Sequence, residues 1–324
     1  MRAVIRLRLI ALLLSAGMLP AQAQDYPSRT ITVIVPFPPG GASDVVARIV
    51  TDQMSRILKQ PMVIENVAGA GGTLGSGRAA AAAGDGYTLL AAAMGSHVAA
   101  PVLTPNLKYD PSTSFVPIGI TAHSPAIVIA RKDFPARDLN EFVAFLQQKN
   151  DALKQAHGGI GASSHMACLL FTKAIGATPT LVAYRGSAPA LNDLIGGHVD
   201  FLCEQSVAVA ESVLGGTVKA YATSGDKRSP TLPNVPTARE LGVPFEMSIW
   251  AGLFAPKETP AEVVSKLAAA LDQALEEPMV RDRLIQLGAS IPDKAERTPA
   301  AFDRFVRAEM ARWAPLLAAV PGKP

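Results

Sequence analysis

The sequence predicts an α/β protein built from two lobes with a ligand cleft between them, and three observations support this fold class. Short β-branched runs alternate with helical stretches along most of the chain, a pattern typical of mainly parallel sheets. The 301 residues that follow a predicted export signal exceed what one compact core usually holds. Several strand-to-helix junctions are rich in glycine and serine, which is typical of loops that approach a ligand closely.

The first 23 residues are predicted to be a removable export signal. Three arginines precede an apolar run at 9–19, and Ala21 and Ala23 supply the small side chains that signal peptidases accept. A retained membrane anchor is the alternative, although the run is too short to span a bilayer comfortably and no lipobox cysteine follows it. We therefore expect a mature chain that begins near Gln24 and works outside the cytoplasm.

The mature chain is electrically neutral. Removal of the signal takes away three arginines and leaves 27 lysines and arginines against 27 acidic residues. A neutral chain without a basic block argues against nucleic acid and anionic membrane surfaces as partners. No later stretch is both apolar enough and long enough to span a membrane.

The N-terminal part of the mature chain alternates strands with helices. We expect strands at 31–35, 61–65 and 87–91 and helices at 44–58 and 74–83. The first helix has an apolar side with helical spacing, which we expect to be buried and which consists of Val45, Val46, Ile49, Met54 and Ile57.

The middle of the chain is predicted to form a sheet of its own. Pro117, Ser124 and Pro125 are breakers ahead of a new strand at 127–130, so we expect the chain to cross between the lobes near 121–125. Further strands are expected at 156–158, 180–184, 199–203 and 218–223, and helices at 139–153, 164–175 and 188–195.

The C-terminal part is too small to form a separate sheet domain. A polar, proline-rich segment at 224–237 leads to a strand at 249–254 and to helices at 261–276 and 300–317. We expect this part to pack on the first lobe, which makes the chain cross between the lobes twice. The predicted division is a signal at 1–23, a first lobe of 24–122 with 228–324, and a second lobe of 123–227.

Four strand-to-helix junctions share a composition suited to anions, and they lie at 37–43, 69–73, 159–164 and 184–187. Glycine lets the backbone approach a ligand, serine or threonine caps the following helix, and the free N–H groups of a helix start favour an anion. The same residues also make ordinary turns and N-caps. Four junctions of this kind around one cleft favour an uncharged site that binds carboxylates.

Sequence signatures for other chemistry fail. The run that starts at Gly159 has Ser164 where a dinucleotide loop needs glycine or alanine, and no P-loop sequence occurs. The five histidines are scattered, and neither a CxxC pair nor HExxH is present. We therefore expect no cofactor and no structural metal.

A serine hydrolase is the enzyme alternative. Ser163, Ser164 and His165 offer a nucleophile and a base, but consecutive residues at a helix start point in different directions, and GxSxG is absent. We favour hydrogen bonding to a ligand or to helix backbone for the serines and packing of the first turn for His165. The protein is therefore expected not to be an enzyme.

The chain contains two cysteines, Cys168 and Cys203. Export permits a disulfide between them. Two buried free thiols are the alternative, and the sequence leaves both open.

Several longer segments, in one fixed order, carry a family resemblance. They are 26–48, 66–72 (NVAGAGG), 85–90 (DGYTLL), 184–186 (YRG), 189–194 (PALNDL), 232–237 (LPNVPT) and 250–256 (WAGLFAP). Together they closely resemble the Bug, or TctC-like, family of periplasmic substrate-binding proteins of tripartite tricarboxylate transporters. The resemblance covers essentially the whole mature chain.

This resemblance implies a type 2 periplasmic-binding fold, in which two α/β lobes, joined by two crossover connections, close on a small organic carboxylate like a Venus flytrap. It also implies a location in the periplasm. In that family, loops that correspond to 37–43 and 161–165 act as pincers on the carboxylate. The expected ligand-binding residues are Phe37, Gly40, Gly41, Ala42, Ser43, Ser96, His97, Gly161, Ala162, Ser163, Ser164, His165, Tyr184, Gly186 and Glu204.

The resemblance does not fix the ligand. Arg185 either contacts a second carboxylate or stays solvated, and Glu204 either meets an ammonium or hydroxyl group or caps a neighbouring helix. The expected partners are the carboxylate and the membrane subunits of a tripartite tricarboxylate transporter, and we expect a monomer. A sensor component that presents a ligand to a signalling receptor is the alternative.

Overall fold

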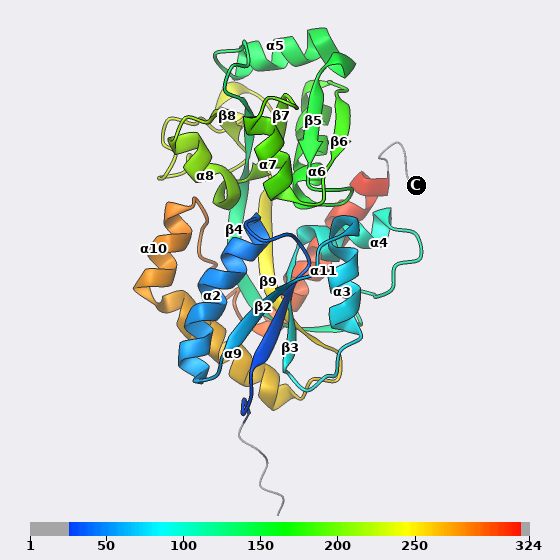
Figure 1. The fold of residues 1–324 in the computed structure, drawn as a ribbon, viewed down its shortest axis with the longest axis vertical. Coiled ribbons are helices and arrows are strands. Elements are labelled where there is room, and N and C mark those ends of the chain that lie inside the picture. Colours follow the sequence, from blue (N-terminus) through cyan, green and yellow to red (C-terminus); the bar gives the residue numbers. More distant parts are fainter. Residues whose placement is uncertain (1–25, 319–324) are drawn as a thin grey trace, which may run out of the picture.

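The computed structural model describes residues 26–318, which form a mixed α/β protein that is elongated and divided into two lobes (Figure 1). This architecture agrees with the α/β class expected from the sequence. The predicted signal at 1–23 lies outside the described residues. Between residues 26 and 318, no helix combines the length and the apolar character that a membrane span requires.

The first lobe, at the bottom of Figure 1, is a sheet covered by helices on both faces. In this sheet β1 (Ile31–Val35) pairs in parallel with β2 (Met62–Asn66) and β3 (Thr88–Ala93), and β9 (Ser248–Pro256) lies antiparallel between β3 and the first part of β4 (Phe115–Arg131). One face packs against α2 (Ala42–Leu58), α9 (Ala261–Glu276) and α10 (Pro278–Gln286). The other face packs against α3 (Thr73–Ala80), α4 (Ala100–Leu103) and α11 (Pro299–Ala318).

The second lobe, at the top of Figure 1, is built on the remaining part of β4. Its sheet has the order β8 (Val218–Thr223), β4, β7 (Phe201–Gln205), β5 (Lys154–His157) and β6 (Thr180–Ala183). Its helices are α5 (Leu139–Lys149), α6 (Ser163–Ile175), α7 (Ser187–Ile195) and α8 (Ser206–Leu214).

The strand β4 differs most from the sequence expectation, which began a new strand only at 127. It runs unbroken from Phe115 to Arg131 and belongs to both sheets. The prolines do not break it, because the register against β9 shifts next to Pro117, and Pro125 pairs with Ser248 at the very start of β9. Prolines are tolerated at bulges and at the ends of pairing, where their missing N–H is not needed.

The expectation of mainly parallel sheets was also wrong. Strand pairs that involve neither β4 nor β9 are parallel, as in β1 with β2 and β5 with β6. All pairs that involve β4 or β9 are antiparallel. The strands β4 and β9 are antiparallel to each other because they belong to opposite crossings of one chain and lie side by side.

The helices differ from the expectation in several places, of which one early end and two missed helices are the clearest. The helix expected at 139–153 ends at Lys149, because Asn150 adopts a positive φ of 42° and a 3₁₀ turn, η3 (Asn150–Ala152), follows. The sequence analysis missed α8, whose apolar composition hides the helical period. It also missed α10, although Pro278 at its first turn is a helix-start signal. The remaining short helical segments are η1 (Ala70–Gly72), the π-helix η2 (Gly95–Ala99) and η4 (Arg239–Leu241).

The return crossing between β8 and β9 is held against β4 by one buried side chain. The Ser224 hydroxyl accepts from the Ala126 N–H at 2.8 Å and donates to the Met247 carbonyl at 2.5 Å. Because Ala126 lies in β4 and Met247 directly precedes β9, this serine ties both crossings together. The two crossings agree with the predicted connectivity, and the lobe boundaries at 122/123 and 227/228 stay a prediction.

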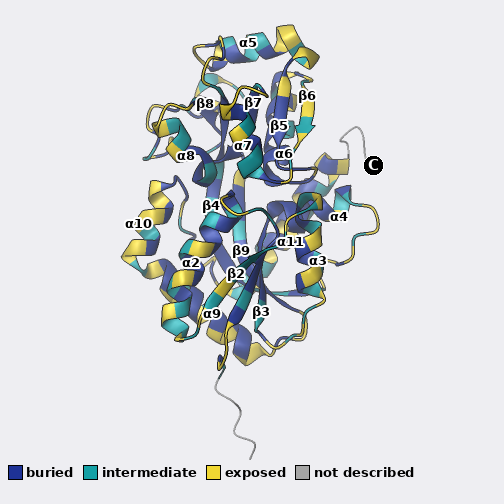
Figure 2. Cartoon of the chain, viewed as in Figure 1, coloured by how far each residue is buried: buried dark blue, intermediate teal, exposed yellow. Residues whose placement is uncertain are grey.

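Burial follows the sheet and continues through the crossings (Figure 2). One core cluster joins Phe142 and Phe171 of the second lobe to Trp250 and Phe302 of the first through Phe245. The two lobes therefore share an apolar core on the side of α6 and α11. A ligand cleft must lie on another side of the contact between the lobes.

Cys168 of α6 and Cys203 of β7, separated by 35 positions in sequence, form a disulfide with their Cα atoms 5.1 Å apart. Both side chains are fully buried. The bond joins the helix to the sheet within the second lobe.

We expect Gly252→Val to destabilise the protein by about 1–3 kcal/mol, as overpacked core substitutions do. Gly252 lies on β9, where a Cβ atom would collide with the buried Phe302 ring and lie 3.0 Å from the Gly119 carbonyl oxygen. Urea unfolding measures the change. Gly77→Ala on α3 is the control, since a Cβ there meets nothing closer than 3.8 Å, and an equal loss in both variants would contradict the packing argument.

We expect unfolded, non-reduced protein to contain no free thiol. Replacing both Cys168 and Cys203 with alanine should lower the free energy of unfolding by about 3–4 kcal/mol, because the cross-link restricts the unfolded chain. A thiol titration in denaturant checks the first statement and urea unfolding the second. Two titratable thiols would refute the disulfide.

Candidate functional site

Helix starts from both lobes meet at one small cavity. From the first lobe, α2 contributes Ala42 and Ser43, and from the second lobe α6 contributes Ser163 and Ser164 and α7 contributes Ser187. The cavity has a volume of about 20 Å³, enough for roughly one water molecule. The remaining lining residues are Phe37, Gly41, Gly158, Ala162, Glu204 and Gln205.

The helices around the cavity have no side-chain cap, contrary to the expectation that serine or threonine would cap them. The N-cap positions of α2, α6, α7 and α8 are Gly41, Ala162, Gly186 and Gln205, and none accepts a capping hydrogen bond through its side chain. The serines fall one or two positions later, inside the first turn. The first-turn N–H groups thus keep their capacity to bind an anion, and the positive ends of four helix dipoles face one cavity.

The first-lobe loop is shaped by a carboxylate that is itself fully engaged. Asp44 Oδ2 accepts from the Gly40 N–H and from Arg48 Nε, both at 2.9 Å, and its Oδ1 accepts from Asn66 Nδ2 at 2.8 Å. Asn66 Nδ2 also donates to the Phe37 carbonyl at 3.0 Å. These donors hold the pKa of Asp44 below its usual value although burial opposes the shift. Asp44 therefore positions the loop.

The second-lobe loop is held by two histidines. His157 Nδ1 accepts from the Gly159 N–H and His165 Nδ1 accepts from the Gly161 N–H, each at 3.2 Å. Both side chains are buried, and their ring centroids are 4.5 Å apart. Burial lowers the pKa of both rings, that of His165 to about 4, with His157 adding to the effect on His165. Both rings are therefore neutral acceptors at neutral pH.

The two lobes touch across the cavity at glycines. A Cβ atom added to Gly186 would collide with the Pro38 ring, and one added to Gly71 would collide with the Ile160 carbonyl oxygen. A Cβ on Gly95 would lie 2.8 Å from the Gly161 oxygen. Backbone from each lobe thus approaches the other as closely as atoms allow.

Glu204 is the second-last residue of β7 and lines the small cavity. It is 0% exposed, its Oε1 accepts from the Gln205 N–H at 2.8 Å, and its Oε2 has no hydrogen-bond partner among the described residues. Burial raises the pKa of Glu204, and the neighbouring Ser187 and Ser164 hydroxyls and the Gln205 N–H offset this only in part.

The structure brings eight of the expected residues to the cavity wall: Phe37, Gly41, Ala42, Ser43, Ala162, Ser163, Ser164 and Glu204. Gly40, Gly161, His165 and Gly186 support the same loops from behind. Ser96 and His97 are not brought there. His97 lies in the π-helix η2 and packs in an aromatic cluster, with its ring centroid 4.2 Å from that of Phe254. Burial lowers the pKa of His97 to about 3. Ser96 donates to the Ala93 carbonyl instead.

Tyr184 belongs to a second, outer cavity of about 330 Å³, and Arg185 lies beside it. Phe37 and Gly158 line both cavities, so the two are neighbours. The Tyr184 hydroxyl donates to Asp193 Oδ2 at 2.6 Å. Tyr184 also lines the wall of the outer cavity. The outer cavity gives the site room beyond the helix starts.

Sequence reasoning missed Gly158, Ser187 and Gln205. Gly158 and Ser187 lie in or next to junctions that were singled out, so the junction composition was a sufficient signal. Gln205 directly follows Glu204 at the end of β7 but was not among the expected ligand-binding residues. It reaches the cavity because the strand ends there and Gln205 becomes the N-cap of α8.

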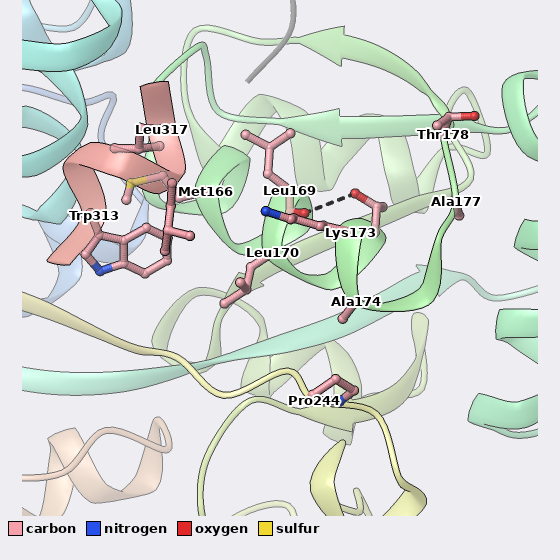
Figure 3. A pocket seen from close by; sticks show the side chains of 12 residues that line it. Met166, Leu169, Leu170, Lys173, Ala174, Ala177, Thr178, Pro244, Trp313 and Leu317 are labelled. Carbon is pink, nitrogen blue, oxygen red and sulfur yellow. Dashed lines mark hydrogen bonds between the residues drawn. The ribbon is translucent and has the colours of Figure 1, made fainter. Parts of the chain in front are cut away.

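Other cavities lie away from these loops. A pocket of about 590 Å³ lies between α6 and the end of α11, walled by Leu169, Leu170 and Trp313 (Figure 3). Its wall is mainly apolar and contains no helix start, so it lacks the free N–H groups that the small cavity offers to a carboxylate. Among residues 26–318, no group of three or more His, Cys, Asp and Glu side chains is placed to hold a metal ion.

The geometry does not support the hydrolase alternative. Ser164 Oγ accepts from the Gly158 N–H at 2.9 Å, and His165 Nδ1 is occupied by the Gly161 N–H. Within the described chain, no hydrogen bond joins His165 to Ser163 or Ser164. The base therefore has no contact with a nucleophile.

Known proteins are similar to this chain in sequence and in fold over almost its full length. Residues 46–321 match the family model described as tripartite tricarboxylate transporter family receptor, TctC. MatC from Rhodopseudomonas palustris with bound malate is 43% identical, with a TM-score of 0.87 over 90% of this chain and 100% of that one. The periplasmic binding protein BugD is 40% identical (TM-score 0.86, 90% and 97%). A second R. palustris protein, with adipate, is 30% identical (TM-score 0.86, 91% and 98%).

We expect the folded protein to lose stability as the pH falls from 6.5 towards 4. An unfolded histidine takes up a proton near pH 6.5, whereas folded His165 does so only near pH 4, so the unfolded state binds more protons in this window. For His165 alone the loss by pH 5 is about 2 kcal/mol.

Urea unfolding at pH 7 and pH 5 checks this expectation. His165→Gln should have a smaller pH dependence than the parent protein, because one depressed pKa is removed. His198→Gln, at an exposed histidine, is the matched control and should keep the parent dependence. Equal pH dependence in the parent and in His165→Gln would contradict the argument.

Proposed function

The chain belongs to the TctC family of tripartite tricarboxylate transporter receptors, and on that premise we propose that its cleft captures a small organic carboxylate and delivers it to the membrane subunits of such a transporter. The family is one of periplasmic binding proteins and not of enzymes, so the hydrolase alternative is wrong. The fold is the type 2 periplasmic-binding fold that the resemblance implied.

One observation carries the proposal: uncapped helix starts from both lobes face the same cavity. A carboxylate there accepts from N–H groups of α2 and of α6 at once. These double contacts exist only when the lobes are together, so a ligand shifts the population towards the closed arrangement. The relatives with malate and with adipate support a carboxylate as the ligand class.

We assign the binding roles by position. Gly41, Ala42 and Ser43 form the first pincer, and Ala162, Ser163 and Ser164 form the second. The remaining expected residues shape these loops or the outer cavity. In this proposal Ser96 and His97 have no contact with the ligand, because both lie in the core.

The lobe boundaries, location and assembly complete the proposal. We place the first lobe at 24–122 with 228–324 and the second at 123–227, which is supported by the change of sheet partners along β4. The chain works in the periplasm as a monomer after cleavage near Ala23. Membrane subunits then recognise the closed form.

Replacing Gly41 or Ser163 with leucine is expected to weaken carboxylate binding by at least about 100-fold, or ~2.7 kcal/mol, without unfolding the protein. Either side chain fills a cavity of only about 20 Å³ and blocks the N–H groups. Calorimetric titration follows a thermal-shift screen of dicarboxylates, tricarboxylates and aromatic carboxylates, in which a ligand at 100 times its Kd stabilises the protein by about 2.7 kcal/mol.

Ala261→Leu is the matched control, because Ala261 is an exposed first-turn residue of α9. It should bind like the parent protein. Unchanged affinity in Gly41→Leu and Ser163→Leu would refute this site, and chemical turnover of the bound ligand would refute a pure binding function.

A further inference from the structure

One fully buried side-chain oxygen in the wall of the small cavity has no hydrogen-bond partner among the described residues. Glu204 Oε2 is buried and accepts no hydrogen bond from the described residues, while Oε1 is satisfied by the Gln205 N–H. A buried oxygen in this state costs free energy of folding, commonly about 1–3 kcal/mol. Glu204 lines the cavity, so a molecule bound there meets this oxygen.

The surroundings of Glu204 define what it accepts. No charged side chain contributes to the pKa shift of this residue, which is opposed only by the Ser187 and Ser164 hydroxyls and the Gln205 N–H. The starts of α7 and α8 lie beside it, with Ser187 in the cavity wall and Gln205 as the N-cap of α8. The positive ends of these helices disfavour a cation. A neutral hydrogen-bond donor therefore suits this position better than an ammonium group.

The size of the cavity fixes how far that donor lies from the ligand carboxylate. The starts of α2 and α6 and the free oxygen of Glu204 face one space of about 20 Å³, roughly the size of a water molecule. Groups that reach both must be separated by only a few bonds. A hydroxyl on the carbon next to the carboxylate meets this condition.

We propose that Glu204 is a specificity-determining residue whose free carboxyl oxygen selects 2-hydroxycarboxylates over carboxylates without that hydroxyl. The inference rests on the proposed function, since it presumes a carboxylate at the helix starts. The carboxylate binds between α2 and α6, and the hydroxyl donates to Glu204 Oε2. The rest of the ligand extends past Phe37 and Gly158 into the outer cavity of about 330 Å³.

The test uses pairs of probes that differ only in the 2-hydroxyl: malate against succinate, and lactate against propionate. Calorimetric titration of the parent protein should give about tenfold tighter binding of the hydroxylated member. Aspartate and alanine present a 2-ammonium group instead and should bind less tightly than malate and lactate.

Variants then assign the preference to this residue. Glu204→Leu removes the acceptor at similar volume, so the ratio of the two affinities should fall to about one while succinate still binds. Glu204→Gln keeps a carbonyl oxygen and should retain part of the preference. Glu262→Leu, at an exposed glutamate of α9, is the control and should keep the parent ratio. A general loss of stability changes both affinities alike and leaves the ratio unchanged.

These measurements test the role of Glu204 separately from carboxylate capture itself. If the parent protein binds succinate as tightly as malate, or prefers the amino acids, the role of Glu204 is overturned while carboxylate capture stands. An unchanged ratio in Glu204→Leu overturns it as well. If no probe of any pair binds, the proposed function fails and this inference fails with it. If Glu204→Leu does not fold, the titrations of the parent protein with malate, succinate and aspartate still test the preference for a 2-hydroxyl group.

Discussion

The site depends on a single strand that belongs to two sheets. The first part of β4 pairs with β9 in the first lobe, and the second part pairs with β7 and β8 in the second. This shared strand sets the position of one sheet relative to the other, and Ser224 holds the return crossing against it. The loops after β1, β5, β6 and β7 consequently open into the same space. Every residue that lines the small cavity follows one of these strands or ends it.

The helices that start at the small cavity lack side-chain capping bonds, which lowers helix stability but leaves their first N–H groups free for an anion. Alanine at the N-cap of α6 gives up a capping bond commonly worth about 1 kcal/mol, whereas glycine at the N-caps of α2 and α7 costs only roughly a few tenths of that. Other bonds compensate nearby. Asp44 and Asn66 hold the first loop, and His157 and His165 hold the second. The structure thus keeps rigid loops around helix starts that remain free.

Sequence reasoning succeeded where a local rule decides the outcome. Strand β1 and helix α9 matched their expected bounds, and most glycine-rich junctions proved to line the cleft. It failed where the outcome depends on pairing between distant segments. Pro117 reads as a breaker until its bulge against β9 is seen. His97 follows a strand as ligand residues often do, but a π-helix turns it into the core. Which oxygen of Glu204 stays without a hydrogen bond depends on segments that meet only in the folded protein, and no local pattern encodes this.

The disulfide has a consequence for how the protein should be produced. Cys203 directly precedes Glu204, and Cys168 lies five residues after Ser163 on the same helix, so the bond spans the two walls of the second-lobe site. In an oxidising compartment, this covalent tie fixes the spacing between pincer and acidic wall. In a reducing cytosol only packing maintains it. Protein made without export therefore lacks this covalent link between α6 and β7, which lies beside the proposed ligand site.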